Sequence, residues 1–189
     1  ESSVLKNYFN EKKKNKNSGW CIIIYGFSGA GKSEISKKIK NNIEKIIGKT
    51  IIFDGDEIRT FFAKIGLEFG YTKKDRDKTV IPKLTLLNLI LKKNVNIIYP
   101  TIFLNKLAIQ KWTKGLDNLV KVHIKAEIKD IINFGKKKIF YEITKDIVGV
   151  NINPVYPKNP QITIENDFKK SINSLSKKLT SELNVILKK

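Results

Sequence analysis

The sequence has very few cysteines and histidines. Its 189 residues include one cysteine, Cys21, and one histidine, His123. A single cysteine excludes an internal disulfide and is typical of a protein in a reducing compartment. One cysteine and one histidine are also too few to build a metal-binding cluster. We therefore expect a cytoplasmic protein in which Cys21 and His123 have structural roles.

Long apolar runs are also absent. No run approaches the ~20 residues that span a bilayer, and the first 20 residues lack the apolar core of a signal peptide. Hydrophobic residues make up 41% of the chain and charged residues 29%, a balance typical of globular domains. We expect no membrane partner, a polar extension or linker at residues 1–18, and one folded domain at residues 19–189.

Acidic residues and arginine are scarce. The chain has 37 lysines and arginines against 18 acidic residues, a net charge of +19, yet its only arginines are Arg59 and Arg76. Such a charge can indicate nucleic-acid binding, but lysine is abundant throughout, as codon bias would produce, and no helix-turn-helix, RNP or zinc pattern accompanies it. We expect no nucleic-acid partner. The two arginines either form surface ion pairs or use their bidentate guanidinium groups to bind a phosphate or sulfate of a second substrate.

The most informative stretch runs from Gly26 to Ser33. Its sequence, G-F-S-G-A-G-K-S, matches G-x-x-x-x-G-K-[ST] and follows the apolar run Cys21–Tyr25. In such a loop the backbone N–H groups surround a phosphate, the lysine reaches the β- and γ-phosphates, and the hydroxyl binds Mg²⁺. The alternative is a glycine-rich turn without a ligand. We expect ATP and Mg²⁺ as cofactors, Ser33 as a metal ligand, and phosphate binding by Gly26, Ser28, Gly29, Ala30, Gly31, Lys32 and Ser33.

A second candidate site is the stretch Asp54-Gly55-Asp56, which directly follows an expected strand at residues 50–53. The carboxyl ends of parallel strands are where an open α/β sheet places its chemistry. Two aspartates separated by a glycine can point into one crevice, one towards Mg²⁺ and one towards an acceptor hydroxyl. The alternative is a turn in which an aspartate caps the following helix.

Strands and helices alternate along the rest of the chain. This order predicts the α/β class, with a three-layer α/β/α sandwich around a mostly parallel sheet. The irregular, basic stretch at about 135–160 is typical of a lid that closes over phosphates. We expect strands near residues 20–25, 50–53, 94–99, 119–124 and 161–165. We expect one helix that ends near Ile47, a second at 57–65, a long third from Thr72 to Lys93 with a bend at Pro82, a fourth through Trp112, a fifth at 127–134 and a last one at the C-terminus.

The order of these motifs resembles the adenylylsulfate kinase family, which has the P-loop NTPase fold. The likeness covers Ser18 to Lys189 and rests on G-F-S-G-A-G-K-S, D-G-D-E-I-R, F-G-Y-T-K-K-D-R, D-I-V-G-V and P-K-N-P. It implies a phosphotransferase that moves the γ-phosphate of ATP to the 3′-hydroxyl of adenosine 5′-phosphosulfate. Asp56 would then lie at the acceptor hydroxyl and Asp54 would help to hold Mg²⁺.

The same resemblance implies roles for further residues. Lys32, Asp54 and Asp56 would be catalytic, with Asp54 also a metal ligand. Arg59 and Arg76 would hold the phosphate end of the acceptor, and Tyr71 would stack on its base. The acceptor-binding residues would be Asp56, Arg59, Tyr71, Arg76, Thr101, Phe103 and Lys137.

Several positions depart from the family pattern. Thr79 stands where the family usually has an asparagine, Tyr99 replaces the serine of its I-S-P motif, and the lid pattern is reduced to a remnant near Lys137. G-Y-T, V-G-V, P-K-N-P and T-I-F instead resemble a branch that includes kinases of cytidine-linked nucleotides, such as cytidine diphosphoramidate. Adenosine phosphosulfate and a cytidine-linked nucleotide both remain open as acceptors. We also consider a homodimer and, as the alternative function, a catalytically impaired nucleotide-binding or regulatory module.

Overall fold

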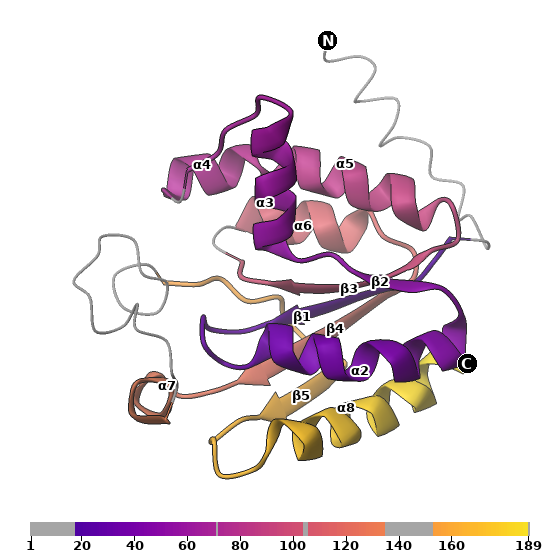
Figure 1. Ribbon diagram of the computed structural model, residues 1–189, viewed down its shortest axis with the longest axis vertical. Helices are drawn as coiled ribbons and strands as arrows, with labels where there is room; N and C mark the ends of the chain where they lie inside the picture. Colours follow the sequence, from indigo (N-terminus) through magenta and orange to yellow (C-terminus); the bar gives the residue numbers. More distant parts are fainter. Residues whose placement is uncertain (1–17, 71, 104–105, 135–152, 189) are drawn as a thin grey trace.

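Five parallel β-strands form one sheet through the middle of the molecule (Figure 1). The computed structural model describes residues 18–70, 72–103, 106–134 and 153–188. The strands lie in the order β2-β3-β1-β4-β5, and each neighbouring pair is parallel, which confirms the predicted sheet. The strands are β1 Cys21–Tyr25, β2 Thr50–Ile52, β3 Asn96–Thr101, β4 Leu119–Lys125 and β5 Ile162–Glu165.

Helices cover both faces of this sheet and complete three layers. α2 (Lys32–Ile47) and α8 (Ile172–Leu187) lie on one face, and α3 (Gly55–Lys64), α5 (Val80–Leu91) and α6 (Lys106–Lys114) lie on the other (Figure 1). All five residues of β1, including Cys21, are buried, because the central strand is covered from both sides. The remaining helices are α4 Lys73–Lys78 and α7 Ile128–Phe134.

The prediction of one long helix from Thr72 to Lys93 was wrong. α4 ends at Lys78 and α5 begins at Val80, so that Pro82 lies in the first turn of α5. A proline ring clashes with the carbonyl group four residues earlier, which here is that of Lys78. The helix therefore breaks at Thr79 instead of bending at Pro82. The predicted cap at the start is confirmed, since Thr72 Oγ1 accepts a hydrogen bond from the N–H of Asp75 at 3.2 Å.

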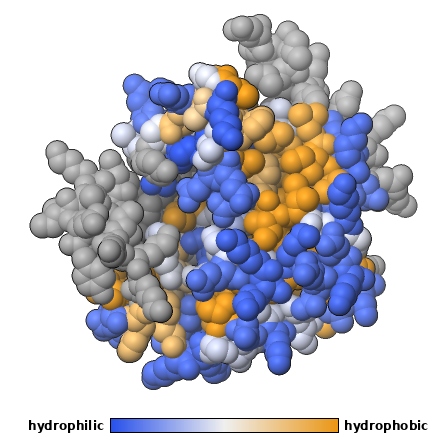
Figure 2. Space-filling view, in the orientation of Figure 1, coloured by the Kyte–Doolittle hydropathy of each residue, from blue (hydrophilic) through white to orange (hydrophobic). Residues whose placement is uncertain are grey.

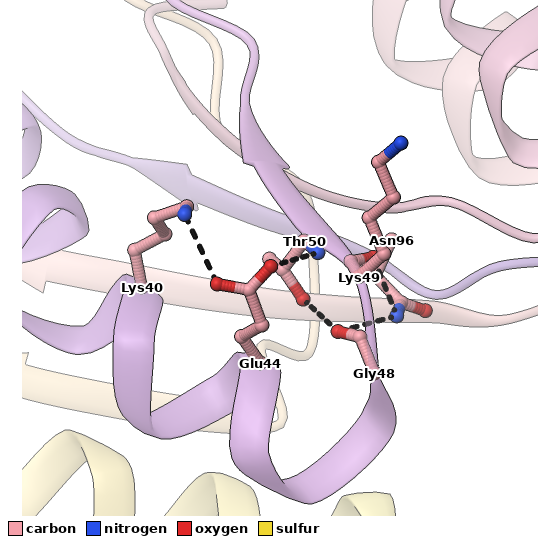
Figure 3. Close-up of polar contacts among 6 residues, drawn as sticks. All are labelled: Lys40, Glu44, Gly48, Lys49, Thr50 and Asn96. Carbon is pink, nitrogen blue, oxygen red and sulfur yellow. Dashed lines mark hydrogen bonds and ion pairs between the residues drawn. The ribbon is translucent and has the colours of Figure 1, made fainter.

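Partly buried polar contacts fix the corner where α2 leads into β2 (Figure 3). Asn96, the first residue of β3, is 3% exposed, and its Nδ2 donates to the carbonyl oxygens of Ile47 at 2.9 Å and Lys49 at 3.0 Å. The N–H of Thr50 donates to Oε1 of Glu44 at 3.3 Å. These bonds set the position of β2, and β2 leads directly to Asp54.

The molecular surface is divided between polar and apolar regions. In Figure 2, hydrophilic residues cover the part of the molecule that holds α2, whereas hydrophobic residues gather beside α3. Large apolar side chains of α3, the turn after it and α5 are exposed, among them Phe61 at 46% and Ile65 at 56%. None of the described helices is both long and apolar enough to cross a membrane.

Several predictions fall outside the described residues. These are the polar extension apart from Ser18, the base-stacking residue Tyr71, the candidate acceptor residue Lys137, and the expected lid up to residue 152.

Candidate active site

The loop after β1 has the geometry of a phosphate-binding loop. Gly26 has φ 150° and Gly31 has φ 92°, conformations that residues with a Cβ rarely adopt. A Cβ on Gly26 would also overlap the carbonyl oxygen of Ile124 in β4. Gly31 is the N-cap of α2, so the loop ends at the positive end of that helix. Backbone N–H groups at such a position can bind an anion.

Lys32 is the first residue of α2 and is 8% exposed. Its Nζ donates a hydrogen bond to the carbonyl oxygen of Phe27 at 2.6 Å. The ammonium group therefore stays at the loop instead of extending into solvent. A cation held there can pair with the oxygens of a bound phosphate.

Asn166 braces the same loop from the sheet edge, and the sequence reasoning missed it. This residue directly follows β5 and is 2% exposed. Its Nδ2 donates to the carbonyl oxygen of Ala30 at 3.0 Å, and its Oδ1 accepts from the N–H of Phe168 at 3.1 Å. The only signal in the sequence was a polar residue after the last strand, which is equally typical of an ordinary turn.

Ser33 and Asp54, both predicted metal ligands, lie side by side. Ser33 Oγ donates to Asp54 Oδ2 at 3.4 Å, although one residue lies at the start of α2 and the other is the N-cap of α3. A hydroxyl and a carboxylate oxygen are ligands that Mg²⁺ accepts in proteins, so the pair fits this cation. Asp54 is also the N-cap of α3, because its Oδ1 accepts from the N–H of Asp56 at 2.9 Å. Both interpretations of this aspartate are thus compatible.

Asp56 lies in the first turn of α3 and is exposed. No other described residue makes a hydrogen bond or ion pair with its carboxylate. Its backbone N–H donates to Asp54 Oδ1, so Asp56 is linked to the Ser33–Asp54 pair and follows Asp54 by two positions in the sequence. An exposed carboxylate beside a candidate phosphate and metal site can accept a proton from a substrate hydroxyl.

Arg59 uses its guanidinium group on the backbone of the following loop. Nη1 donates to the carbonyl oxygens of Phe69 at 2.8 Å and Gly70 at 2.6 Å. These contacts join α3 to the segment that leads to Tyr71, whose own placement lies outside the described residues. Arg59 therefore positions a loop, and its predicted contact with the acceptor stays a prediction.

The remaining predicted acceptor residues lie on two elements. Arg76 is half-buried in the last turn of α4. Thr101 ends β3, and Phe103 follows it with 4% of its surface exposed. The Phe103 ring packs edge-on against Tyr25, with ring centroids 6.1 Å apart, so this side chain belongs to the core in the structure.

An aromatic cluster lies next to the loop. The rings of Tyr25 and His123 stack with centroids 5.0 Å apart, and Tyr156 lies 4.9 Å from His123. Burial raises the pKa of both tyrosines to about 12. Burial, together with the positive charge of Lys125, lowers the pKa of His123. These contacts agree with a structural role for His123.

Tyr99 replaces the serine that the family pattern would have at this position. Its ring stacks on Trp112 with centroids 4.5 Å apart and meets Phe53 edge-on at 5.4 Å. Burial raises the pKa of its hydroxyl to about 12. An aromatic side chain therefore fills the space beside the end of β2.

Comparison with known proteins agrees with this geometry. The family model for adenylylsulphate kinase matches residues 18–165. An adenylyl-sulfate kinase of Rippkaea orientalis (strain PCC 8801 / RF-1) is 28% identical over 167 residues, which cover 86% of this chain and 90% of that protein. Another, from Myxococcus xanthus (strain DK1622), is 26% identical over 161 residues, covering 80% of this chain and 84% of that protein.

The fold is also found among solved structures. The Mycobacterium tuberculosis APS kinase CysC, in complex with AMPPNP and APS, has a TM-score of 0.72 and 19% identity, covering 88% of this chain and 98% of that chain. At this identity the likeness concerns the fold, and the assignment rests on the family model, which spans most of the chain. The chain belongs to the adenylylsulphate kinase family and is a nucleotide kinase of that type, a P-loop phosphotransferase with ATP as its phosphate donor.

Proposed function

We propose that this protein transfers the γ-phosphoryl group of ATP to the 3′-hydroxyl of a nucleotide, with adenosine 5′-phosphosulfate as the acceptor. The observation that carries the proposal is the contact of Ser33 Oγ with Asp54 Oδ2 at 3.4 Å, next to Lys32 and followed by Asp56. This arrangement supplies the parts that phosphoryl transfer requires: a phosphate loop, a cation site and a carboxylate for the hydroxyl proton. The acceptor is proposed because the curated relatives are adenylyl-sulfate kinases.

The proposed chemistry is a direct, in-line displacement. The 3′-oxygen of the acceptor forms a bond to the γ-phosphorus while the bond from that phosphorus to the β–γ bridging oxygen breaks. Asp56 accepts the hydroxyl proton, and ADP leaves with the electron pair of the broken bond. The Lys32 ammonium offsets the negative charge that develops on the transferred group and on ADP.

Mg²⁺ fits the site through the Ser33 hydroxyl and the Asp54 carboxylate. When bound with ATP, this cation neutralises phosphate oxygens. Because Asp54 also caps α3, its position is fixed by the start of the same helix that carries Asp56. The start of one helix thus carries both the proposed cation ligand and the proposed proton acceptor.

The acceptor is proposed to bind on the side of α3 and α4. Arg76 would hold its anionic group, Tyr71 would stack on its base, and Arg59 would contribute there while it positions the loop at residues 69 and 70. A cytidine-linked nucleotide is the second candidate acceptor. It is supported by Tyr99, a buried residue stacked on Trp112, which stands where the family pattern has a small serine.

An ADP-release assay tests the proposal directly. We expect turnover with ATP, Mg²⁺ and adenosine 5′-phosphosulfate, tested against cytidine diphosphate derivatives. Lys32→Ala should lower turnover by roughly 100-fold or more, since it removes a preorganised charge. The control Lys38→Ala changes an exposed lysine of the same helix and should retain full turnover.

Each outcome of this assay separates the alternatives. Turnover with a cytidine derivative alone would change the proposed acceptor but leave the proposed reaction, phosphoryl transfer to a nucleotide, in place. Nucleotide binding without turnover on every acceptor would favour a regulatory module. Normal turnover by Lys32→Ala would contradict the assignment of the site.

We also propose that two copies of the chain associate through the side that holds α3 and α5. Four large apolar side chains there are exposed by 46% to 56%: Phe61, Ile65, Leu67 and Leu89. Apolar surface that gathers in one region is typical of association sites. Figure 2 shows a hydrophobic area in this part of the molecule.

A further inference from the structure

The turn between β5 and α8 reaches the phosphate-binding loop through the side chain of Asn166. Its Nδ2 donates to the carbonyl oxygen of Ala30 at 3.0 Å, and its Oδ1 accepts from the N–H of Phe168 at 3.1 Å. Asn166 is 2% exposed, and its backbone N–H donates to the carbonyl oxygen of Lys125 at 2.8 Å. Because an amide has one donor end and one acceptor end, the two side-chain bonds require the orientation in which Nδ2 faces Ala30.

The bond to Ala30 determines the direction of the next N–H group. In a trans peptide unit the carbonyl group and the following N–H point in opposite directions, and no peptide bond of the described residues is cis. The N–H of Gly31 therefore points away from Asn166. Within the described part of the chain, no group accepts a hydrogen bond from this N–H, so it remains available for a bound anion.

Gly31 is held from its other side as well. Its carbonyl oxygen accepts a hydrogen bond at 2.9 Å from the N–H of Ile35, the fourth residue of α2. A Cβ on Gly31 would lie 3.2 Å from Cδ1 of Ile172, the first residue of α8, and 3.3 Å from Nδ2 of Asn166. The β5–α8 turn thus packs closely against the end of the loop.

We propose that Asn166 is a positioning residue for the phosphate donor: it holds the peptide between Ala30 and Gly31 so that the N–H of Gly31 donates to a phosphate of the bound nucleotide. This inference rests on the proposed function, because it takes the loop as the site of the ATP phosphates. An N–H group that is already oriented needs no reorganisation when the nucleotide binds, and this gain is lost when the peptide can rotate.

A direct contact with the nucleoside is the competing role for Asn166. Its side chain also lines a surface hollow beside the loop, together with Glu127, Glu165, Asp167 and neighbouring residues. Tripolyphosphate distinguishes the two roles, because it carries phosphates without a base or a sugar. A residue that orients the loop affects the binding of tripolyphosphate, whereas a residue that touches only the nucleoside does not.

Calorimetric titration of ADP, and separately of tripolyphosphate, into the full chain with Mg²⁺ tests this inference. Asn166→Ala removes both side-chain bonds. Asn166→Asp keeps an acceptor for the N–H of Phe168, loses the donor to Ala30 and adds a charge. The two variants share only the loss of the donor. Each should weaken binding of both ligands by roughly 10- to 100-fold, the loss expected for a hydrogen bond to a charged group.

Asn118→Ala is the matched control. Asn118 directly precedes β4, and its Nδ2 donates to the carbonyl oxygen of Ser18 at 2.7 Å. This is the same kind of bond, but it lies at the amino ends of the strands, whereas the loop follows the carboxyl end of β1. The control should bind both ligands like the wild type. Thermal unfolding of every variant sets the temperature below which all of them are folded, and the titrations are made there.

Steady-state kinetics supply a readout that a loss of stability would not move. A variant that is only destabilised has fewer folded molecules, which lowers the apparent kcat and leaves both KM values unchanged. The Asn166 variants should instead raise KM for ATP by roughly 10-fold or more, while KM for the acceptor stays near that of the wild type.

The outcomes separate this inference from the proposed function. If Asn166→Asp binds both ligands as tightly as the wild type does, the inference is overturned and the proposed function stands. Weaker binding by only one of the two variants would assign the effect to the added charge or to the turn at Phe168, and weaker binding of ADP alone would assign it to the nucleoside; each result also overturns the inference. If the wild type binds neither ligand, the proposed function fails and the inference fails with it.

Discussion

Asn96→Ala tests whether the corner between α2 and β2 stabilises the fold that carries the site. The Asn96 side chain is 3% exposed and reaches both sides of this corner. Its Oδ1 accepts from the N–H of Trp20 at 2.8 Å, and its Nδ2 donates to the carbonyl oxygens of Ile47 at 2.9 Å, Lys49 at 3.0 Å and Gly48 at 3.3 Å. Alanine removes every one of these contacts and leaves the backbone groups without this partner; Figure 3 shows the contacts to Gly48 and Lys49.

The size of the effect follows from these contacts. A hydrogen bond contributes about 0.5–1.5 kcal/mol net to the free energy of unfolding, and three of the four distances are 3.0 Å or shorter. We expect Asn96→Ala to lower the free energy of unfolding by about 2–4 kcal/mol. For a chain of this size, that loss lowers Tm by roughly 5–15 °C.

Urea unfolding followed by tryptophan fluorescence and by circular dichroism measures this loss. Asn42→Ala is the matched control, because Asn42 is exposed on α2 and alanine favours a helix. The control should retain the stability of the wild type or gain slightly. A loss below about 0.5 kcal/mol in Asn96→Ala would refute the reasoning, since it would mean that water replaces the side chain at no cost.

Two further predictions concern activity and assembly. Asp56→Asn should lower turnover by roughly 100- to 10,000-fold, because the amide cannot accept the hydroxyl proton, while the affinity for ADP stays near that of the wild type. ADP release measures turnover and calorimetry measures ADP affinity. Turnover within threefold of the wild type would contradict the assignment of Asp56. Light scattering of the wild type should give twice the chain mass of 21.7 kDa. Leu89→Lys should shift the protein towards the monomer, because it places a charge on the apolar side of α5. A monomeric wild type would exclude the proposed association.

Local patterns in the sequence predicted the elements closest to the site. The apolar run Cys21–Tyr25 is β1, the helix after the glycine-rich loop ends at Ile47 as expected, and Thr72 caps α4. These features depend on residues that are neighbours along the chain: side-chain periodicity, glycine conformations and side-chain caps. The break at Thr79 could not be predicted in the same way, because the position at which a proline interrupts a helix also depends on how the two halves of that helix pack.

The sequence by itself determined the phosphate loop, the aspartates at the end of β2 and the α/β class, since each is specified by residues a few positions apart. Only the tertiary structure decided which groups support them. Asn166 holds the loop through Ala30, a residue 136 positions away, and Asn96 bonds to Trp20 across 76 positions. Arg59 turns to the backbone of a later loop. Such partners meet only after the sheet has brought distant segments together, and no pattern of neighbouring residues encodes them.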